Sequence, residues 1–381
     1  MLSPLPPVSK RLHSVGESGT TRIFTLAQTL RRQGLDIISL AVGEPDFDTP
    51  APVVAATRRA LADQKTRYGA VAGIDPLRKR LAGAFHGYGP ANIIITNGAK
   101  QGLYSLFQVL LNPGDEVILS KPCWVSFTEQ IKLAGGVPVL VETRDHQLDP
   151  AAVRQAVTGR TKAILINSPN NPTGAVYSRE ELEAVVRIAE TSECWLIADE
   201  AYHTFAYPPA THVRAFDLSA RPERIITVRS FSKHYMMTGF RLGYVAGPEE
   251  VIKAMTDLQS HLCGNVCSFA QYGALAALEM DQAFVEQYRT ALQRRRDIAF
   301  ECTDRLFDCV QPAGAFYLFP NIENVLDAAE SSEAFALRLL RKSGVAVVPG
   351  EAFDKPGHIR ISFGIAEAQL RTAFERIERL L

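Results

Sequence analysis

Short apolar runs alternate with helical patterns through the middle of the chain, and this alternation limits the possible folds more than any other feature. The runs are four to six residues long, as strands usually are. Strands that alternate with helices predict an α/β fold, in which a mostly parallel sheet is covered by helices on both faces. The predicted strands are residues 93–96, 116–119, 137–141, 162–166, 195–198, 224–228 and 242–247.

The pattern changes after residue 248. Three longer helices are predicted first, at about 249–261, 268–279 and 283–306. Short apolar runs at 315–319, 345–348 and 358–362 then predict a small sheet, with further helices at 332–342 and 367–381. This indicates a second, smaller α+β lobe. A chain of 381 residues is long enough for two domains. We expect an N-terminal arm that belongs to the small domain (1–47), a large domain (48–280) and a C-terminal small domain (281–381).

Residues that can bind a ligand follow several of the predicted strands. Gly98 follows the first strand in an Asn-Gly turn, Asn171 and Asp199 follow later strands, and Lys233 lies between the last two. In open α/β sheets ligands bind outside the carboxyl ends of the strands. The sequence therefore predicts that these residues share one ligand site.

The segment around Lys233 has the residues that one particular kind of cofactor needs. Ser230 and Ser232 precede this lysine and Arg241 follows it. A lysine amine can attack an aldehyde, and hydroxyls beside a guanidinium suit a phosphate dianion. An amine next to a phosphate site is what pyridoxal phosphate requires.

Other classes of protein fit less well. The chain has neither the GxxxxGK[ST] spacing of a P-loop nor a GxGxxG motif, which argues against a nucleotide hydrolase and a dinucleotide dehydrogenase. Lysine plus arginine and aspartate plus glutamate both number 41, so no net charge favours nucleic acid or a membrane surface. The six cysteines form no CxxC pair, which predicts reduced thiols and no metal site. With no signal peptide or apolar span in the sequence, we expect a cytoplasmic enzyme.

Five motifs in a fixed order resemble those of the class I and II aminotransferases, which are fold-type-I enzymes dependent on pyridoxal 5'-phosphate. The resemblance extends from about residue 14 to the C-terminus and is greatest to the prokaryotic aspartate and aromatic aminotransferases. It implies a large domain with a mostly parallel seven-stranded sheet between helices, and a smaller α+β domain. The motifs are Gly43-Glu44-Pro45-Asp46-Phe47, Asn170-Asn171-Pro172-Thr173-Gly174, Asp199-Glu200-Ala201-Tyr202, Ser230-Phe231-Ser232-Lys233 with Arg241, and His358-Ile359-Arg360-Ile361-Ser362.

The resemblance also implies roles for individual residues. Lys233 would hold the cofactor covalently and then act as the catalytic base, Asp199 would face the pyridine nitrogen, and Tyr202 would contact the ring oxygen. The substrate carboxylate would be bound by Arg360 with Gly43 and Asn171. The other residues implied to bind the cofactor are Gly98, Ala99, Lys100, Ser230, Ser232 and Arg241 at the phosphate, Asn171 at the ring oxygen, Trp124 against the ring, and Tyr68 from the neighbouring subunit of a homodimer.

The predicted activity is transfer of an amino group between an L-amino acid and a 2-oxo acid by a ping-pong mechanism, with glutamate and 2-oxoglutarate as one pair. A C–S lyase or a cyclase on the same scaffold is an open alternative, because these reactions begin with the same proton loss. A transcription regulator that contains such a domain is less well supported, since no basic helix-turn-helix signal precedes it. The sequence assigns no role to His234, His261 or Asn265.

Overall fold

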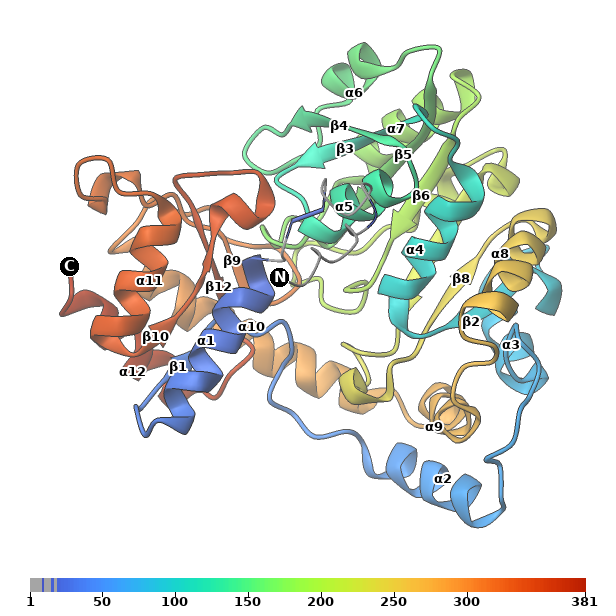
Figure 1. Ribbon diagram of the computed structural model, residues 1–381, viewed down its shortest axis with the longest axis horizontal. Coiled ribbons are helices and arrows are strands. Elements are labelled where there is room, and N and C mark those ends of the chain that lie inside the picture. The colour runs from blue at the N-terminus through green and yellow to red at the C-terminus, as the bar shows by residue number, and fades with distance from the viewer. Residues whose placement is uncertain (1–8, 10–14, 17–18) are drawn as a thin grey trace, which may run out of the picture.

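The computed structural model describes residues 9, 15, 16 and 19–381 and divides into a large and a small lobe (Figure 1). The proline-rich beginning of the predicted arm, residues 1–7, lies outside the described residues. Within the described part of the chain, no helix combines the length and the apolar character that crossing a membrane requires.

A seven-stranded sheet forms the centre of the large lobe, as predicted. Its strand order is β2-β8-β7-β6-β5-β3-β4, and only β8 runs antiparallel to its neighbours. β8 is antiparallel because the chain returns directly from β7 through the loop that contains Lys233, with no crossover helix. The strands are β2 (Ile93–Thr96), β3 (Glu116–Lys121), β4 (Val137–Glu142), β5 (Thr161–Asn167), β6 (Trp195–Asp199), β7 (Ile225–Ser230) and β8 (Gly243–Ala246).

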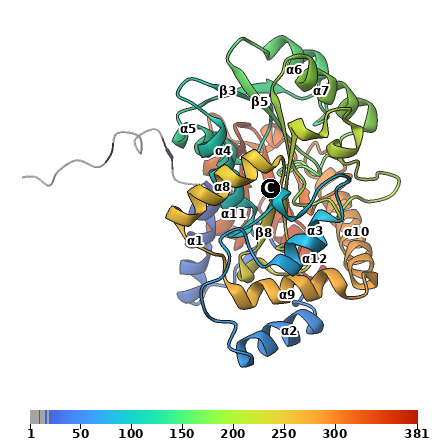
Figure 2. The ribbon, with the colours of Figure 1, turned by 90° about the vertical axis from the view of Figure 1, so that its right-hand side faces the viewer.

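Helices cover both faces of this sheet (Figures 1 and 2), because successive side chains of each strand point to opposite faces. In β2, Ile94 belongs to one apolar cluster, whereas Ile93 and Ile95 belong to the other. The first cluster is shared with α4 (Gly98–Leu110), α5 (Val125–Leu133) and α8 (Glu249–Leu262). The second is shared with α2 (Ala51–Ala62), α3 (Asp75–Ala82), α6 (Pro150–Ala156), α7 (Arg179–Thr191) and α9 (Ser268–Glu279).

The small lobe contains two short sheets with their own apolar clusters. One sheet has the order β11-β12-β9, and the other pairs β1 with β10 in parallel. Its strands are β1 (Ile38–Ser39), β9 (Tyr317–Leu318), β10 (Val345–Ala346), β11 (Val348–Pro349) and β12 (Ile359–Ser362). Its helices are α1 (Gly19–Arg32), α10 (Ala283–Asp304), α11 (Ser332–Ser343) and α12 (Glu367–Glu378). The domain boundaries at 47/48 and 280/281 stay a prediction.

Strand β1, which pairs with β10, is shorter than the sequence predicts. The apolar run at 37–42 predicts a strand, but β1 pairs only at Ile38 and Ser39. Ala41, Val42 and Gly43 instead line a pocket. The early end of this strand therefore supplies backbone to the wall of that pocket.

Candidate active site

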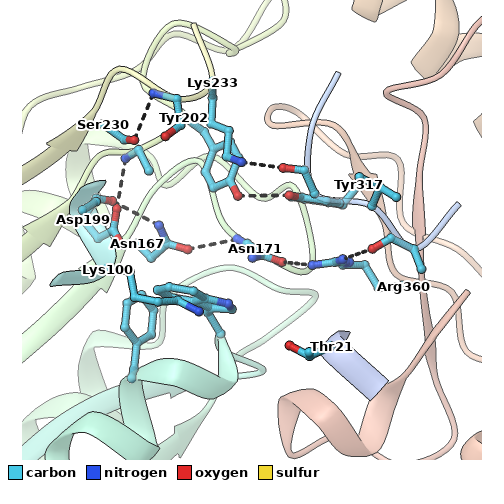
Figure 3. A pocket seen from close by; sticks show the side chains of 18 of the residues that line it. Thr21, Lys100, Asn167, Asn171, Asp199, Tyr202, Ser230, Lys233, Tyr317 and Arg360 are labelled. Carbon is cyan, nitrogen blue, oxygen red and sulfur yellow. Dashed lines mark hydrogen bonds between the residues drawn. The ribbon is translucent and has the colours of Figure 1, made fainter. Parts of the chain in front are cut away.

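A pocket of about 360 Å³ lies at the carboxyl ends of the central strands and is lined by residues of both lobes (Figure 3). Most of the residues singled out from the sequence meet here, although they are spread over more than 300 positions of the chain. Those that line the pocket are Gly43, Ala99, Lys100, Trp124, Asn171, Asp199, Tyr202, Ser230, Ser232, Lys233, Arg241 and Arg360.

Two of the predicted residues do not line this pocket. Gly98 lies directly behind its wall. Its φ is +76°, which strains any residue with a side chain, and a Cβ there would lie 2.6 Å from an Arg241 nitrogen and displace that guanidinium. Tyr68 is 98% exposed and is not among the lining residues. Its predicted contact comes from a neighbouring subunit, so this role stays a prediction.

Lys233 extends from the loop after β7 toward the small lobe. Its Nζ donates to the carbonyl oxygen of Gly43 at 2.5 Å. Burial lowers the pKa of Lys233 to about 8, with further lowering by Arg241, Arg360 and Lys100. A lysine with this pKa has a substantial neutral fraction near neutral pH, which a nucleophile or a base requires.

Asp199 ends β6 and carries a buried carboxyl group without an ion-pair partner among the described residues. One carboxylate oxygen accepts from the N–H of Ala201 at 3.0 Å. Burial raises the pKa of Asp199 to about 7, and the charge of Glu200 adds to the rise. A cationic group bound beside Asp199 would reverse this shift, so the carboxyl group is suited to a protonated ligand atom.

The N-terminus of α4 offers backbone donors beside the pocket. Its first N–H groups have no side-chain cap, which leaves them free to donate to a bound anion. The pocket walls here also carry Ser230, Ser232, Lys100 and Arg241. The Arg241 guanidinium is held by donation to the Thr238 carbonyl at 3.0 Å. Hydroxyls, N–H groups and a guanidinium are the donors expected around a phosphate.

Arg360 is a buried cation on β12, 3% exposed. Its guanidinium donates to Asn171 Oδ1 at 3.0 Å and to the Ala41 carbonyl at 2.8 Å. Its buried Nε has no hydrogen-bond partner, and no carboxylate pairs with it within the described residues. Burial lowers the pKa of Arg360, which means that the site disfavours the unpaired charge. A ligand carboxylate would remove this cost.

Several residues of the pocket were not predicted from the sequence. Thr21 and Phe24 reach the pocket from α1, Tyr317 from β9, and Asn167 from the end of β5. The side-chain oxygen of Asn167 accepts from the N–H of Asn171 at 3.0 Å, and its Nδ2 donates to the Asp199 carbonyl at 3.1 Å. A polar residue at the end of a buried strand was a usable signal for Asn167, whereas the other three lie in ordinary helix or strand patterns.

A buried ion pair lies beside the pocket. Glu200 and Arg229 are joined by two hydrogen bonds of 2.8 and 2.6 Å, and both side chains are at least 90% buried. Burial alone would raise the pKa of Glu200, but Arg229 and His212 outweigh it and lower this pKa to about 2. Since the folded pKa is below the unfolded one, the pair stabilises the fold above about pH 4.5, and this contribution is lost as the pH falls toward 2.

We therefore predict that Glu200→Gln lowers the thermal unfolding midpoint by roughly 10 °C at pH 7, since breaking a buried pair leaves an unpaired charge. Because the pair's contribution disappears in acid, the difference between the variant and the wild type should shrink below pH 4. Thermal melts followed by circular dichroism between pH 3 and 8 measure this. A difference that does not depend on pH would contradict the assignment of the effect to the ion pair.

The chain is similar in sequence and in structure to known proteins whose family agrees with this geometry. Residues 35–377 match the family described as aminotransferase class I and II. The chain is 42% identical to the aspartate aminotransferase of Geobacillus stearothermophilus and 44% identical to the aspartate/prephenate aminotransferase of Thermus thermophilus, with 98% of each chain covered in both cases. Among solved structures, it is similar to the aspartate aminotransferase of Thermus thermophilus with maleate, with a TM-score of 0.95, 44% identity and coverage of 99% of this chain and 100% of the other.

Proposed function

Since this chain belongs to the class I and II aminotransferase family and is an aminotransferase, we propose that it uses pyridoxal 5'-phosphate to transfer the amino group between a dicarboxylic L-amino acid and a 2-oxo acid. The observation that carries this proposal is that Lys233, Asp199 and Arg360 open onto one pocket, each without an ion-pair partner among the described residues. The matched relatives named here are aminotransferases over their full length, which does not favour the lyase or cyclase alternative.

The residues of the pocket fit this cofactor. The uncapped N-terminus of α4 with Ser230, Ser232 and Arg241 would hold the phosphate. Asp199, whose pKa is raised to about 7 by burial, would be stabilised as a carboxylate by a protonated ring nitrogen. Trp124 offers an aromatic face, and Tyr202 and Asn171 offer polar groups for the ring oxygen.

Side chains of this protein transfer the protons and bind the substrate. When bound, pyridoxal 5'-phosphate supplies an aldehyde that combines with amines and a cationic ring that accepts electrons from the substrate's α-carbon. Nζ of Lys233 takes the α-proton and later returns a proton, for which its pKa of about 8 is suitable. Arg360 binds the α-carboxylate and fixes the orientation of the substrate. Two half-reactions in the same pocket give the predicted ping-pong order.

A second cation in the pocket supports the preference for a dicarboxylic substrate. The Lys100 ammonium lies 4.8 Å from the centre of the Trp124 ring, and no carboxylate pairs with it among the described residues. Lys100 lines the same pocket as Arg360, so the two cations can bind the two carboxylates of one substrate. The relatives named for aspartate and the neighbour solved with maleate, which is a dicarboxylate, support this choice.

Lys100→Met tests the role of this cation, because methionine keeps an apolar stem beside Trp124 and removes the charge. We expect kcat/KM for aspartate to fall roughly 10- to 100-fold, as loss of a charged hydrogen bond predicts, whereas kcat/KM for a neutral amino acid such as alanine changes less than about threefold. Steady-state kinetics with both substrates measure this. If Lys100 instead binds the phosphate, both values fall equally and the cofactor binds more weakly.

The function as a whole is tested by absorbance spectroscopy of the purified protein. Supplied with pyridoxal 5'-phosphate, it should develop a yellow band, and aspartate or glutamate added without a 2-oxo acid should convert that band to the pyridoxamine form. Pyruvate or another fragment that accumulates while the band persists would indicate a lyase. If no band forms, the assignment of Lys233 is wrong.

A homodimer also remains part of the proposal. Tyr68 is fully accessible in the single chain and lies on the loop between α2 and α3. An exposed aromatic side chain of this kind is typical of an interface residue. The predicted contact between Tyr68 and the neighbouring subunit's cofactor phosphate is checked by the oligomeric state and by cofactor affinity in Tyr68→Ala. The cytoplasmic location stays a prediction.

A further inference from the structure

Tyr317 is a pocket residue that has no assigned role. It lies on β9 of the small lobe and is 1% exposed. Its hydroxyl lies 3.0 Å from that of Tyr202, which follows β6 of the large lobe. Figure 3 shows the two hydroxyls facing one another across the pocket, next to the bond between Lys233 and Gly43. The pair therefore connects the two lobes at the point where the chemistry is expected.

The surroundings of Tyr317 hold its ring in place. The Arg360 guanidinium lies 4.4 Å from the ring centre, and the Tyr202 ring meets it edge to face with centroids 5.8 Å apart. Its hydroxyl packs against Gly43, where an added Cβ would lie 3.0 Å away. On β9, Tyr317 pairs in register with Ser362 of β12. A ring fixed by these contacts presents its hydroxyl to Tyr202 in a defined direction.

Two hydroxyls that share one hydrogen bond leave one proton free. Neither hydroxyl has another hydrogen-bond partner among the described residues. If Tyr202 donates to Tyr317, its proton is used within the pair. If Tyr317 donates, the Tyr202 proton is free to point at a ligand, and the accepted bond makes Tyr202 a stronger donor.

The charges favour donation by Tyr317. Burial raises the pKa of both phenols, so both are protonated near neutral pH. The Arg360 charge acts to lower the pKa of both phenols, but its guanidinium lies over the ring of Tyr317, 4.4 Å from the ring centre. The pKa of Tyr202 is raised well above its ordinary value. A cation over one ring makes that phenol the more acidic of the two, so the position of Arg360 favours Tyr317 as the donor.

We propose that Tyr317 is a positioning residue, whose hydroxyl donates to Tyr202 and thereby directs the Tyr202 proton toward the ring oxygen of the bound cofactor. This inference rests on the proposed use of pyridoxal 5'-phosphate. If Tyr317 has this role, a residue of the small lobe influences the electronic state of the cofactor through Tyr202.

The test is the apparent pKa of the yellow band of the bound cofactor, measured by absorbance between pH 5 and 10. A hydroxyl that donates to the ring oxygen draws off negative charge, so the neighbouring nitrogen on Lys233 releases its proton more easily. Weakening that donation raises the apparent pKa. We expect Tyr317→Phe to raise it by about half a unit, less than the loss of a whole hydrogen bond would give.

Three further variants isolate the effect. Tyr202→Phe should raise the apparent pKa more than Tyr317→Phe does, and the double variant should match Tyr202→Phe alone, because Tyr317 acts only through Tyr202. Tyr207→Phe is the matched control: Tyr207 is equally buried and donates to the Ala315 carbonyl, but it does not line the pocket. It should leave the apparent pKa unchanged, although it lowers thermal stability.

The possible outcomes distinguish a failure of the proposed Tyr317 role from a failure of the proposed cofactor use. An apparent pKa that is unchanged or lowered in Tyr317→Phe overturns the inference alone, and a lowered value would mean that Tyr202 donates to Tyr317. Equal shifts in Tyr317→Phe and Tyr207→Phe would also overturn it, since they would indicate a general effect of lost packing. A wild-type protein that forms no yellow band overturns the proposed cofactor and this inference together.

Discussion

Lys233→Arg is expected to lower the rate of amino-group transfer by roughly 10⁴-fold, the largest effect of any single substitution in this chain. Arginine keeps the positive charge and most of the length, but it does not lose its proton near neutral pH and so serves neither as a nucleophile nor as a base. The pocket has lowered the pKa of the lysine to about 8, and this advantage is lost with arginine.

Two measurements check this expectation. The variant should form no yellow band with pyridoxal 5'-phosphate, and its single-turnover rate with aspartate should fall by the stated factor. Lys253→Arg is the matched control, because Lys253 is exposed on α8 and pairs with Asp257 at 2.6 Å. It should match the wild type in both measurements. Substantial activity in Lys233→Arg would remove this lysine from the chemistry.

Asp199→Asn is expected to slow the reaction by roughly 10²- to 10³-fold, the cost of losing one preorganised electrostatic contact at a reacting centre. The amide keeps the shape of the side chain and can still accept from the Ala201 N–H, but it no longer stabilises a cation. The variant should also bind the cofactor more weakly. Single-turnover kinetics and a cofactor titration followed by absorbance measure both effects.

The same variant should increase thermal stability, although it lowers activity. The pKa of Asp199 is raised to about 7 in the folded protein, whereas in the unfolded chain this carboxyl group titrates at about pH 4. Between these two pH values the folded protein therefore binds a proton that the unfolded chain has lost. As a result, Asp199 lowers the stability of the fold progressively as the pH rises from about 4 to about 7. Without cofactor, Asp199→Asn should therefore unfold at a higher temperature than the wild type at pH 8, and the difference should vanish below pH 4.

Glu200→Gln is the matched comparison, since it makes the same chemical change at the next residue. Glu200 is paired with Arg229, so this variant should lose stability and keep kcat within about threefold of the wild type below its unfolding temperature. If Asp199→Asn instead lost stability at pH 8 and kept its activity, Asp199 would be a structural residue.

Local sequence signals were sufficient for most elements of the fold. The predicted strand at 93–96 and the predicted helix at 268–279 have the same bounds in the structure, because an apolar run and a 3.6-residue period are set by neighbouring residues. Ser178 and Glu181 form the capping box that begins α7, and their spacing of three residues is visible in the sequence itself. Helix α6 was not predicted, although Asp149 followed by Pro150 is a typical helix start and Asp149 accepts from two N–H groups there.

The sequence by itself determined which residues have the chemistry of the site. Lys233, Asp199 and Asn171 follow strands of one parallel sheet, and topology alone brings such positions to one edge. Only the tertiary structure decided what surrounds them. Tyr317 and Tyr202 are 115 positions apart, Lys233 and Gly43 are 190 apart, and Arg360 and Ala41 are 319 apart.

The physical reason for this division is the range of the forces that act. A helix period, a cap or a strand end depends on residues within a few positions, so the sequence displays it directly. The raised pKa of Asp199 and the lowered pKa values of Lys233 and Arg360 all result from burial, which exists only in the folded chain. The sequence determined the reacting groups, and tertiary packing decided their protonation and their partners.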